Sequence, residues 1–400
     1  MELNHRPRGQ VYSLIAILLT IPVMLFIAFY VTESQNMRYG SLERVVSDQL
    51  HEVEKSLEND FEQAMSISGK RAFLAATDYV ISQGVSLDDS SQRLGELMTQ
   101  GTIYSNPAFV MQDNTIQDWV DKVSILELGF NVNIAYMNPA VANLDGVNTE
   151  LTTTLEINVS DYSGIGSINK IVQKNVVINI EGVEDPIFPL NTQGFVSRSI
   201  RPYPYPYHAI KLVHGTGGLG SCSGEVTFNP SDPNPSGKIL VTSDGTGISG
   251  FAGVVAELSN SPSVPCYVAG ATGAIDAVNN AVTWSGYDEI YLDASTRDIW
   301  SLPIKEAIDI GYYTQFDTGG GPGIMKRLEE DLTATVNGME TFVNLPNIQS
   351  KGVPVKPEQV SLAYLYFSDQ TINGQPVRGL QSWFRMDASN AARYNLTGLM

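Results

Sequence analysis

The sequence predicts an α+β protein in which an N-terminal transmembrane helix continues into a long helical stalk, followed by an α+β domain and a second mixed α/β domain. Three observations support this fold class: an uncharged apolar run at Val11–Val31, a helical repeat of apolar residues after it, and strand-like alternation that begins after Gly129. A length of 400 residues is typical of two or three folded units.

The charge balance of the chain limits its expected partners. Lys and Arg total 24 against 43 Asp and Glu, so the formal net charge is −19. A chain this acidic repels polyanions, and nucleic acid is therefore not an expected partner. The 2 cysteines cannot build a disulfide-rich scaffold, and the 4 histidines provide little material for a zinc cluster.

Residues 11–31 are predicted to be a transmembrane helix. No charged residue interrupts this segment, and at about 1.5 Å per residue it can cross the roughly 30 Å hydrocarbon layer. Pro22 lies midway, which membrane helices tolerate. A buried core helix would rarely be so long and uncharged, and a removable secretory signal would have a shorter apolar region and a small-x-small cleavage site. Residues 11–31 are therefore predicted to anchor the chain in the lipid bilayer as a single transmembrane helix.

Basic residues flank only one end of this segment. Arg6 and Arg8 precede it, and the next basic residue is Arg38. The positive-inside rule therefore predicts that residues 1–10 form a cytoplasmic tail or leader and that the bulk of the chain is extracytoplasmic.

The segment Arg8-Gly9-Gln10 directly before the apolar run resembles the cleavage motif of archaeal type IV pilin-like (class III) signal peptides. The resemblance is confined to the N-terminal segment. It implies a cut between Gly9 and Gln10 that leaves the apolar helix attached to the mature chain. Leu14 stands where many such pilins carry an acidic residue, and this departure bears on filament assembly more than on membrane insertion.

Residues 32–84 are predicted to form the helical stalk. Apolar residues recur at spacings of four and three, which gives a narrow stripe on a nearly straight helix. The stripe consists of Leu42, Val46, Leu50, Val53, Leu57, Phe61 and Ala64. It weakens at Ser66–Gly69 and resumes before Gly84, a residue typical of a helix C-terminus. Two arrangements fit this pattern. The helix could lie on its own domain, or it could continue the membrane helix and pack its C-terminal half on a sheet. In either case the apolar stripe would serve packing or self-association.

The α+β domain is predicted over residues 85–200. Helices are expected at Ser91–Gln100 and from an N-cap at Asn114 or Thr115 to Gly129. Strands are then expected at residues 131–136, 151–159 and 170–180, in a sheet that helices cover on one side.

Residues 201–207 alternate proline and tyrosine and are predicted to be a stiff spacer, in preference to a ligand for an SH3-type partner. The mixed α/β domain would then occupy residues 208–400. Its early part contains strand-like segments at 238–242, 266–270 and 289–292 with a helix-like segment at 251–258, an order typical of a right-handed βαβ unit. Later strands are expected at 362–367 and 380–386, and a helix at 325–332.

Asp232, Asn234 and Ser236 place oxygen-bearing side chains at every second position ahead of a glycine, like the first half of an EF-hand calcium loop. Ser243 stands where such a loop needs a bidentate glutamate, and a turn cluster explains the same residues. Calcium is the single cofactor that the sequence suggests.

Cys222 lies in a Gly-x-Cys-x-Gly segment that has the spacing of a nucleophile elbow. The glycine-rich stretch before it is too flexible to hold a strained nucleophile. A disulfide between Cys222 and Cys266 is the preferred interpretation, because an exported chain meets an oxidising environment. Asn158 and Asn395 begin N-glycosylation sequons, which export would make available for modification.

These features together predict a non-enzymatic, membrane-anchored surface protein with a structural or adhesive role, pilin-like and self-associating through its stalk. Glu184-Asp185-Pro186 and Gly323–Leu332 are also similar to segments of archaeal exported proteins of unknown function. A ligand-binding or sensory head that acts through a membrane partner is the main alternative. An anchored hydrolase is a further alternative, although no nucleophile, base and acid cluster in the sequence.

Overall fold

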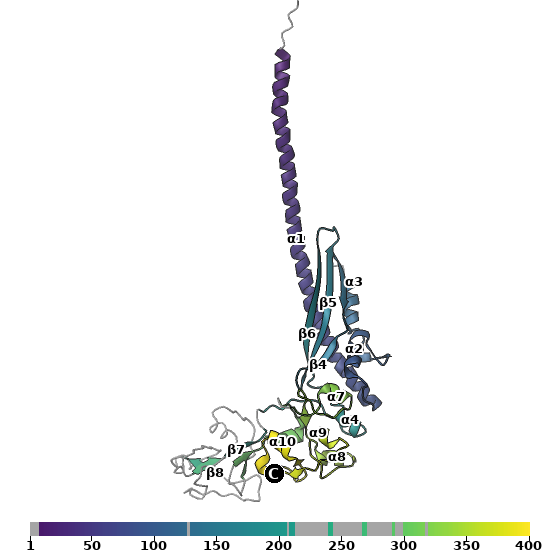
Figure 1. Ribbon diagram of the computed structural model, residues 1–400, viewed down its shortest axis with the longest axis vertical. Helices are drawn as coiled ribbons and strands as arrows, with labels where there is room; N and C mark the ends of the chain where they lie inside the picture. Colours follow the sequence, from purple (N-terminus) through teal and green to yellow (C-terminus); the bar gives the residue numbers. More distant parts are fainter. Residues whose placement is uncertain are drawn as a thin grey trace, which may run out of the picture.

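The structure, a computed structural model, describes residues 8–125, 129–205, 208–212, 239–242, 266–269, 290–292, 299–316 and 319–400. It is a mixed α+β fold in which one very long helix, α1 (Arg8–Gln83), projects from a head made of the remaining elements (Figure 1). The expected apolar helix and the expected stalk are therefore one continuous helix, with Pro22 inside it. Helix α1 ends at Gly84, which adopts a left-handed φ of 65° and donates its N–H to the Val80 carbonyl at 2.9 Å.

The C-terminal half of α1 packs into the head, and its N-terminal half does not. Leu42 is 50% exposed, whereas Leu50 is 2% exposed and Phe61 is fully buried. The apolar stripe weakens at a point where α1 packs closely on the sheet. A Cβ at Gly69 would lie 2.4 Å from Leu151 Cδ1. The small residues in this turn therefore allow close packing and do not mark an end of the helix.

A four-stranded antiparallel sheet lies along this half of α1 (Figure 1). Its strands are β3 (Phe130–Tyr136), β4 (Ala140–Asn143), β5 (Asn148–Asp161) and β6 (Ser167–Asn179). Strand β5 is central: β6 pairs with one edge of it, and β3 and β4 share the other. Alternate residues of β5, such as Leu155 and Ile157, are fully buried beneath α1, while Glu156 and Asn158 are exposed on the opposite face.

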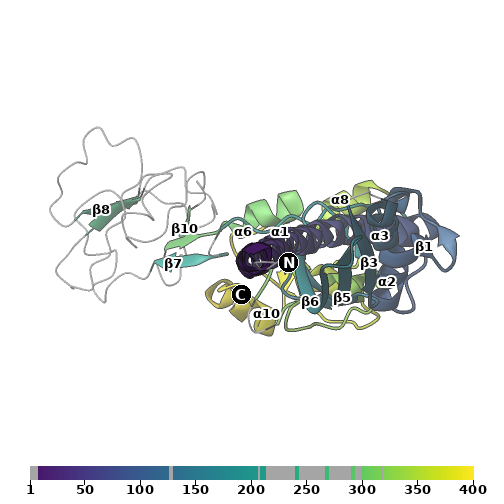
Figure 2. The same ribbon diagram turned by 90° about the horizontal axis from the view of Figure 1, so that it is seen from above.

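Two further helices, α2 (Ser90–Gln100) and α3 (Ile116–Ile125), contact α1 on the covered face of the sheet (Figure 2). The side chain of Asp89 accepts a hydrogen bond from Gln92 N and caps α2. Thr115 and Asp118 exchange hydrogen bonds at the start of α3, at 2.9 Å in each direction, which confirms Thr115 as its N-cap. The arrangement of helices on one side of a sheet is confirmed.

The rest of the head consists of short elements. Between α2 and α3 lie β1 (Thr102–Ile103), β2 (Asn106–Pro107) and the 3₁₀ turn η1 (Phe109–Met111). After β6 come α4 (Ile187–Asn191), β7 (Ile210–Leu212), β8 (Ile239–Thr242), β9 (Cys266–Ala269), β10 (Ile290–Leu292) and β11 (Ile299–Ser301). The C-terminal part contains α6 (Ile304–Glu306), η3 (Ala307–Gly311), β12 (Tyr313–Thr314), α7 (Ile324–Leu328), β13 (Glu340–Thr341), α8 (Leu345–Ser350), α9 (Ala363–Tyr366), β14 (Gln375–Pro376), β15 (Arg385–Met386), α10 (Ala388–Arg393) and η4 (Thr397–Leu399).

Several predictions for this C-terminal part were wrong. Residues 362–367 form the short helix α9, because burial of Tyr364 and Tyr366 against the core overrides their strand propensity. The strand expected at 380–386 is reduced to β15, and the helix expected at 325–332 is reduced to α7. Strands β8 and β9 occur where expected, but they pair antiparallel and so cannot be the parallel strands of a βαβ unit. The helix expected at 251–258 lies outside the described residues.

The chain segments before and after residues 201–207 share a hydrophobic core. Tyr313, Leu328 and Met339 belong to the same buried cluster as α1 and the sheet. Pro202 forms a parallel bridge with Tyr313, so the expected spacer is itself part of the head. The expected division into two domains is therefore not confirmed.

Candidate functional sites

The N-terminal half of α1 contains the most apolar surface of the described chain. Residues Ala16–Gln35 have a mean hydropathy of 2.0, and none of this segment is buried by the head. An exposed apolar surface of this size is typical of a membrane or protein contact. Among the described residues, this is the one helix long and apolar enough to cross a membrane, and a signal sequence has the same properties. Gly9 and Gln10, at the predicted cleavage point, lie in the first turn of α1.

Lysines of the edge strand β6 bind acidic residues of α1 in a polar ladder that we call the clasp, consisting of Lys170, Lys174, Glu54, Glu58 and Glu62. Lys170 Nζ lies 2.5 Å from both Glu54 Oε1 and Glu58 Oε1, and Lys174 Nζ lies 2.7 Å from Glu58 Oε2 and 2.9 Å from Glu62 Oε1. Burial would raise the pKa of Glu58, but hydrogen bonds from both lysines outweigh it and lower the pKa to about 2. The clasp therefore joins the edge strand β6 to α1 through ion pairs.

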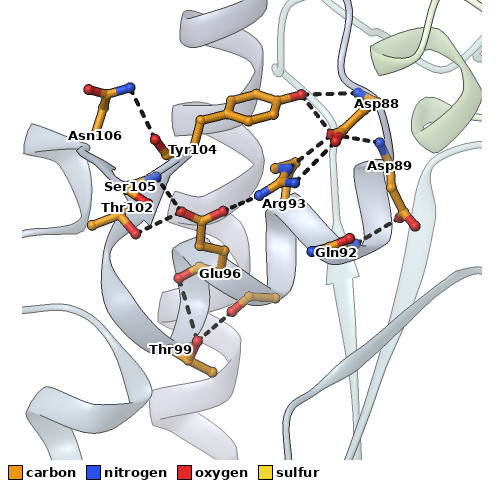
Figure 3. A network of polar contacts seen from close by, with 11 residues as sticks. Asp88, Asp89, Gln92, Arg93, Glu96, Thr99, Thr102, Tyr104, Ser105 and Asn106 are labelled. Atoms are coloured by element: carbon orange, nitrogen blue, oxygen red, sulfur yellow. Dashed lines mark hydrogen bonds and ion pairs between the residues drawn. The ribbon is translucent and has the colours of Figure 1, made fainter.

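A second polar network joins the N-terminal part of α2 to the turn between β1 and β2 (Figure 3). Arg93 Nε donates to Asp88 at 2.9 Å and Arg93 Nη1 donates to Glu96 at 2.6 Å. The network holds a two-residue turn between β1 and β2, in which Tyr104 and Ser105 have left-handed φ angles of 50° and 64°. Tyr104 donates its hydroxyl to Asp88 and Ser105 donates its N–H to Glu96. Each carboxylate therefore stabilises a strained turn, which assigns this network a structural role.

A cavity of about 410 Å³, which we call the aromatic pocket, lies where the residues after 201 meet the C-terminal part. Aromatic side chains dominate the part of its wall that the structure describes. His208 stacks on Tyr203 with ring centroids 4.3 Å apart and an interplanar angle of 11°. Tyr394 meets the His208 ring edge-on at 4.7 Å, and Phe316 lies 5.5 Å from it. The volume is within the range of small-molecule sites, and the lining combines aromatic rings with polar groups such as Arg393 and Asn395.

His208 is held neutral in this pocket. Its Nε2 lies 2.9 Å from Thr314 Oγ1. Burial disfavours the charged imidazolium and lowers the pKa of His208 to about 3. A histidine with this pKa is a weak base, so the hydroxyl–imidazole pair suits binding better than proton abstraction.

Arg393 supplies the positive charge at the pocket wall. Its guanidinium lies 5.5 Å from the centroid of the Phe316 ring and 3.4 Å from Glu340 Oε2. It also donates to the Gly319 carbonyl and to Asn390 Oδ1. Burial raises the pKa of Glu340, and the charge of Arg393 opposes this effect. The pocket therefore combines neutral aromatic surface with one arginine that already has partners.

The structure places some of the residues that the sequence singled out. Asp232, Asn234, Ser236 and Cys222 lie outside the described residues, while Cys266 begins β9 opposite Thr242. The calcium site and the disulfide therefore stay predictions. In the described ranges, no group of three or more His, Cys, Asp and Glu side chains could hold a metal ion.

The two sequons occupy different surroundings. Asn158 is exposed near the C-terminal end of β5, on the face of the sheet away from α1. Asn395 lines the aromatic pocket and donates its amide to the Ala209 carbonyl at 3.0 Å.

Sequence reasoning missed the aromatic pocket. The segment that contains Tyr203 and ends just before His208 was interpreted as a spacer, although its dense tyrosines were a signal for aromatic packing. Arg393 and Tyr394 carried no sequence signal, because their role depends on contacts with residues far away in the chain.

Comparison with known proteins gave no match to a family model, a curated protein or a solved structure.

Proposed function

We propose that this chain is a single-pass membrane-anchored surface protein with a structural or adhesive role, pilin-like in its architecture. The N-terminus would be cytoplasmic and the head extracytoplasmic. One observation carries the proposal: a single helix, α1, has an uncovered apolar half at Ala16–Gln35 and a half that is embedded in the head. The first half suits lipid and the second half suits a core, so α1 would connect the membrane rigidly to the head.

The continuity of α1 favours an anchor over a removed secretory signal. A signal peptidase acting after the apolar segment would have to cut inside a helix that the structure describes without interruption from Arg8 to Gln83. A cut between Gly9 and Gln10, as in the pilin-like signals that the N-terminus resembles, would leave the apolar segment in place. Self-association would then use the part of α1 that the head leaves uncovered, including Leu42 and Val45.

Membrane anchoring is tested by placing a charge in the apolar segment. A lysine at the centre of a transmembrane helix costs about 2.5–3.5 kcal/mol of insertion free energy. We expect the Leu25→Lys variant to shift from the membrane fraction to the soluble fraction. Ile67→Lys, at an exposed position of α1 beside the head, is the matched control and should stay in the membrane. Equal membrane retention of both variants would contradict the anchor.

Topology and processing need two further measurements. Protease added to intact cells should remove the head if it is extracytoplasmic, and a head that is cut only after the cells are lysed would contradict the proposed orientation. Mass spectrometry of the mature chain should find an N-terminus at Gln10 if pilin-type processing occurs. An intact Met1 would leave an anchored surface protein without that processing.

The aromatic pocket favours a second candidate, a ligand-binding head that acts through a membrane partner. Native mass spectrometry of the protein purified from its own membranes should then detect a bound small molecule. Gln315 lies on the exposed rim of the pocket, and Gln315→Trp should fill the cavity and abolish the bound mass. A spectrum without bound mass in the unaltered protein would argue against this candidate.

A further inference from the structure

The face of the sheet that points away from α1 is uncovered in the described part of the chain. On β6, the alternate residues from Asn169 to Asn179 are all exposed. On β3 and β5, Asn133, Glu156 and Asn158 are exposed as well. Helices α1, α2 and α3 lie on the opposite face, and no helix among the described residues packs on this side of the sheet.

This outer face is almost uncharged, in contrast to the chain as a whole. Its members on β3, β5 and β6 are Asn131, Asn133, Ala135, Glu150, Thr152, Thr154, Glu156, Asn158, Ser160, Asn169, Ile171, Gln173, Asn175, Val177 and Asn179. Ile171 is 67% exposed and Val177 is 52% exposed, both on the edge strand β6. A neutral, asparagine-rich face with exposed β-branched residues on a sheet edge tends to pair with other sheets unless something covers it.

Asn158 lies on the central strand of this face, near the β5–β6 turn, and begins the sequon Asn158-Val159-Ser160. Because residues alternate along a strand, Asn158 and Ser160 both point outward while Val159 is buried. Asn133 of β3 and Asn169 of β6 are its direct cross-strand neighbours. Among the described contacts, the Asn158 amide makes no hydrogen bond, so its Nδ2 is accessible for substitution.

The sequon at Asn395 differs from the one at Asn158 in the hydrogen bonding of its amide and in its backbone conformation. Asn395 Nδ2 already donates to the Ala209 carbonyl at 3.0 Å. Asn395 also has a left-handed φ of 58°, whereas Asn158 has the extended backbone of strand β5. Asn395 is itself exposed, so modification there would have to compete with this hydrogen bond beside the aromatic pocket.

We propose that Asn158 carries an N-linked glycan that covers the outer face of the sheet, and that Asn395 is not glycosylated. The inference rests on the proposed function, because glycan transfer requires export of the head. The donor would be an oligosaccharide linked to a polyprenyl phosphate or pyrophosphate. A bond forms between Asn158 Nδ2 and the sugar C1, the bond from C1 to the phosphate oxygen breaks, and the lipid-linked phosphate leaves with the electron pair. The amide proton passes to a base of the transferase.

The position of the glycan explains the exposed apolar residue beside it. Ile171 pairs across the strands with Glu156, so it lies diagonal to Asn158 and within reach of the first sugar residues. The C–H face of a sugar ring can rest on the Ile171 side chain while its hydroxyls contact the surrounding asparagines. A covered outer face would leave the head soluble and would prevent sheet-to-sheet pairing between copies.

Glycopeptide mass spectrometry of the full chain, purified from its own membranes, tests the inference. We expect a glycan on the peptide that contains Asn158 and an unmodified peptide around Asn395. Ser160→Ala should abolish the modification by removing the sequon hydroxyl. Thr397→Ala, the matched change in the other sequon, should leave the glycan mass unchanged. We also expect the Ser160→Ala protein to form more aggregates than the Thr397→Ala protein, as measured by light scattering.

An unmodified Asn158 would overturn the inference, and so would equal modification of Asn395. Protease treatment of the same intact cells tells the two failures apart. If the head is accessible from outside and Asn158 is unmodified, the glycan inference alone fails. If the head is protected and Asn158 is unmodified, the proposed topology fails with it.

Discussion

Arg327 is the side chain whose loss we expect to destabilise the head most. It is fully buried and forms an ion pair with the fully buried Asp185. Its Nε donates to the Pro322 carbonyl at 2.8 Å and its Nη2 donates to the Met339 carbonyl. The Arg327→Met variant would therefore leave a carboxylate and two carbonyls buried without these donors.

The expected magnitude follows from these losses. Removing one partner of a buried ion pair costs about 3–5 kcal/mol of the free energy of unfolding. At roughly 2–4 °C per kcal/mol, the melting temperature should fall by about 6–20 °C. Lys351, which is exposed, provides the control: Lys351→Met should change the free energy of unfolding by no more than about 0.5 kcal/mol.

A double variant separates the buried charge from the lost packing. Asp185→Asn removes the charge and keeps one acceptor oxygen, which can still accept from Ile187 N, while its NH₂ group can donate to the Tyr313 hydroxyl oxygen. We expect Arg327→Met combined with Asp185→Asn to be more stable than Arg327→Met alone, since the unpaired charge is gone. Circular dichroism during heating of the full chain in detergent provides the measurement.

The same pair tests whether the head is one cooperative unit. Asp185 precedes residues 201–207 in the sequence and Arg327 follows them. If the two parts share one core, amide hydrogen exchange should accelerate together in β5 and in α9 of the Arg327→Met protein. Acceleration confined to α9 would refute the shared core. A loss of less than about 1 kcal/mol in Arg327→Met would refute the energetic argument.

Three further predictions concern the clasp, the pocket and the close approach of α1 to the sheet. Lys174→Met should lower the free energy of unfolding, measured by urea denaturation, by about 1–3 kcal/mol, because the Lys174 side chain is only 12% exposed. Lys170→Met should lower it by less, because the Lys170 side chain is 43% exposed. Equal effects of the two variants would contradict this ranking. Burial lowers the pKa of His208 to about 3 in the fold, against 6.5 in the unfolded chain. The stabilisation by neutral His208 is therefore complete above pH 6.5 and is lost as the pH falls toward 3. At pH 5 the free energy of unfolding should be lower by about 2 kcal/mol. His208→Gln should remove the part of the pH dependence between pH 6.5 and 4.5, and an unchanged profile would mean that His208 is not buried in its neutral form. Gly69→Ala should destabilise the protein by about 1–3 kcal/mol in thermal unfolding, because the new Cβ would overlap the Leu151 side chain. The Cβ of Gly95→Ala would have its nearest neighbour at 3.6 Å, so this change should stabilise α2 by up to about 1 kcal/mol. Stabilisation by both changes would refute the close contact at Gly69.

Local patterns predicted the half of the molecule that has strong periodicity. The caps at Thr115 and Gly84 are local backbone chemistry, and both occur where the sequence placed them. The three long strands of the sheet also occur where expected, with β5 longer at both ends and β6 beginning three residues earlier than predicted. The weak point of the stalk pattern at Gly69 was ambiguous, because a gap in an apolar stripe looks the same whether a helix ends or packs closely.

The C-terminal part was predicted less well for a physical reason. Its elements are a few residues long, so no window contains enough repeats to separate a period of 2 from one of 3.6. In α9, burial of Tyr364 and Tyr366 decides the conformation of a segment whose own propensity favours a strand. Burial of that kind depends on the whole fold.

The sequence by itself determined the long apolar helix and the order of the longer helices and strands up to β6, since each of these depends on neighbours within a few turns of the chain. Only the tertiary structure decided that Lys174 reaches Glu58, that Arg327 reaches Asp185, and that His208 and Tyr394 share a pocket. Such pairs are distant in sequence, and charge or ring chemistry alone allows many partners. The packing of α1 on the sheet and of the C-terminal elements beneath it selects one partner for each.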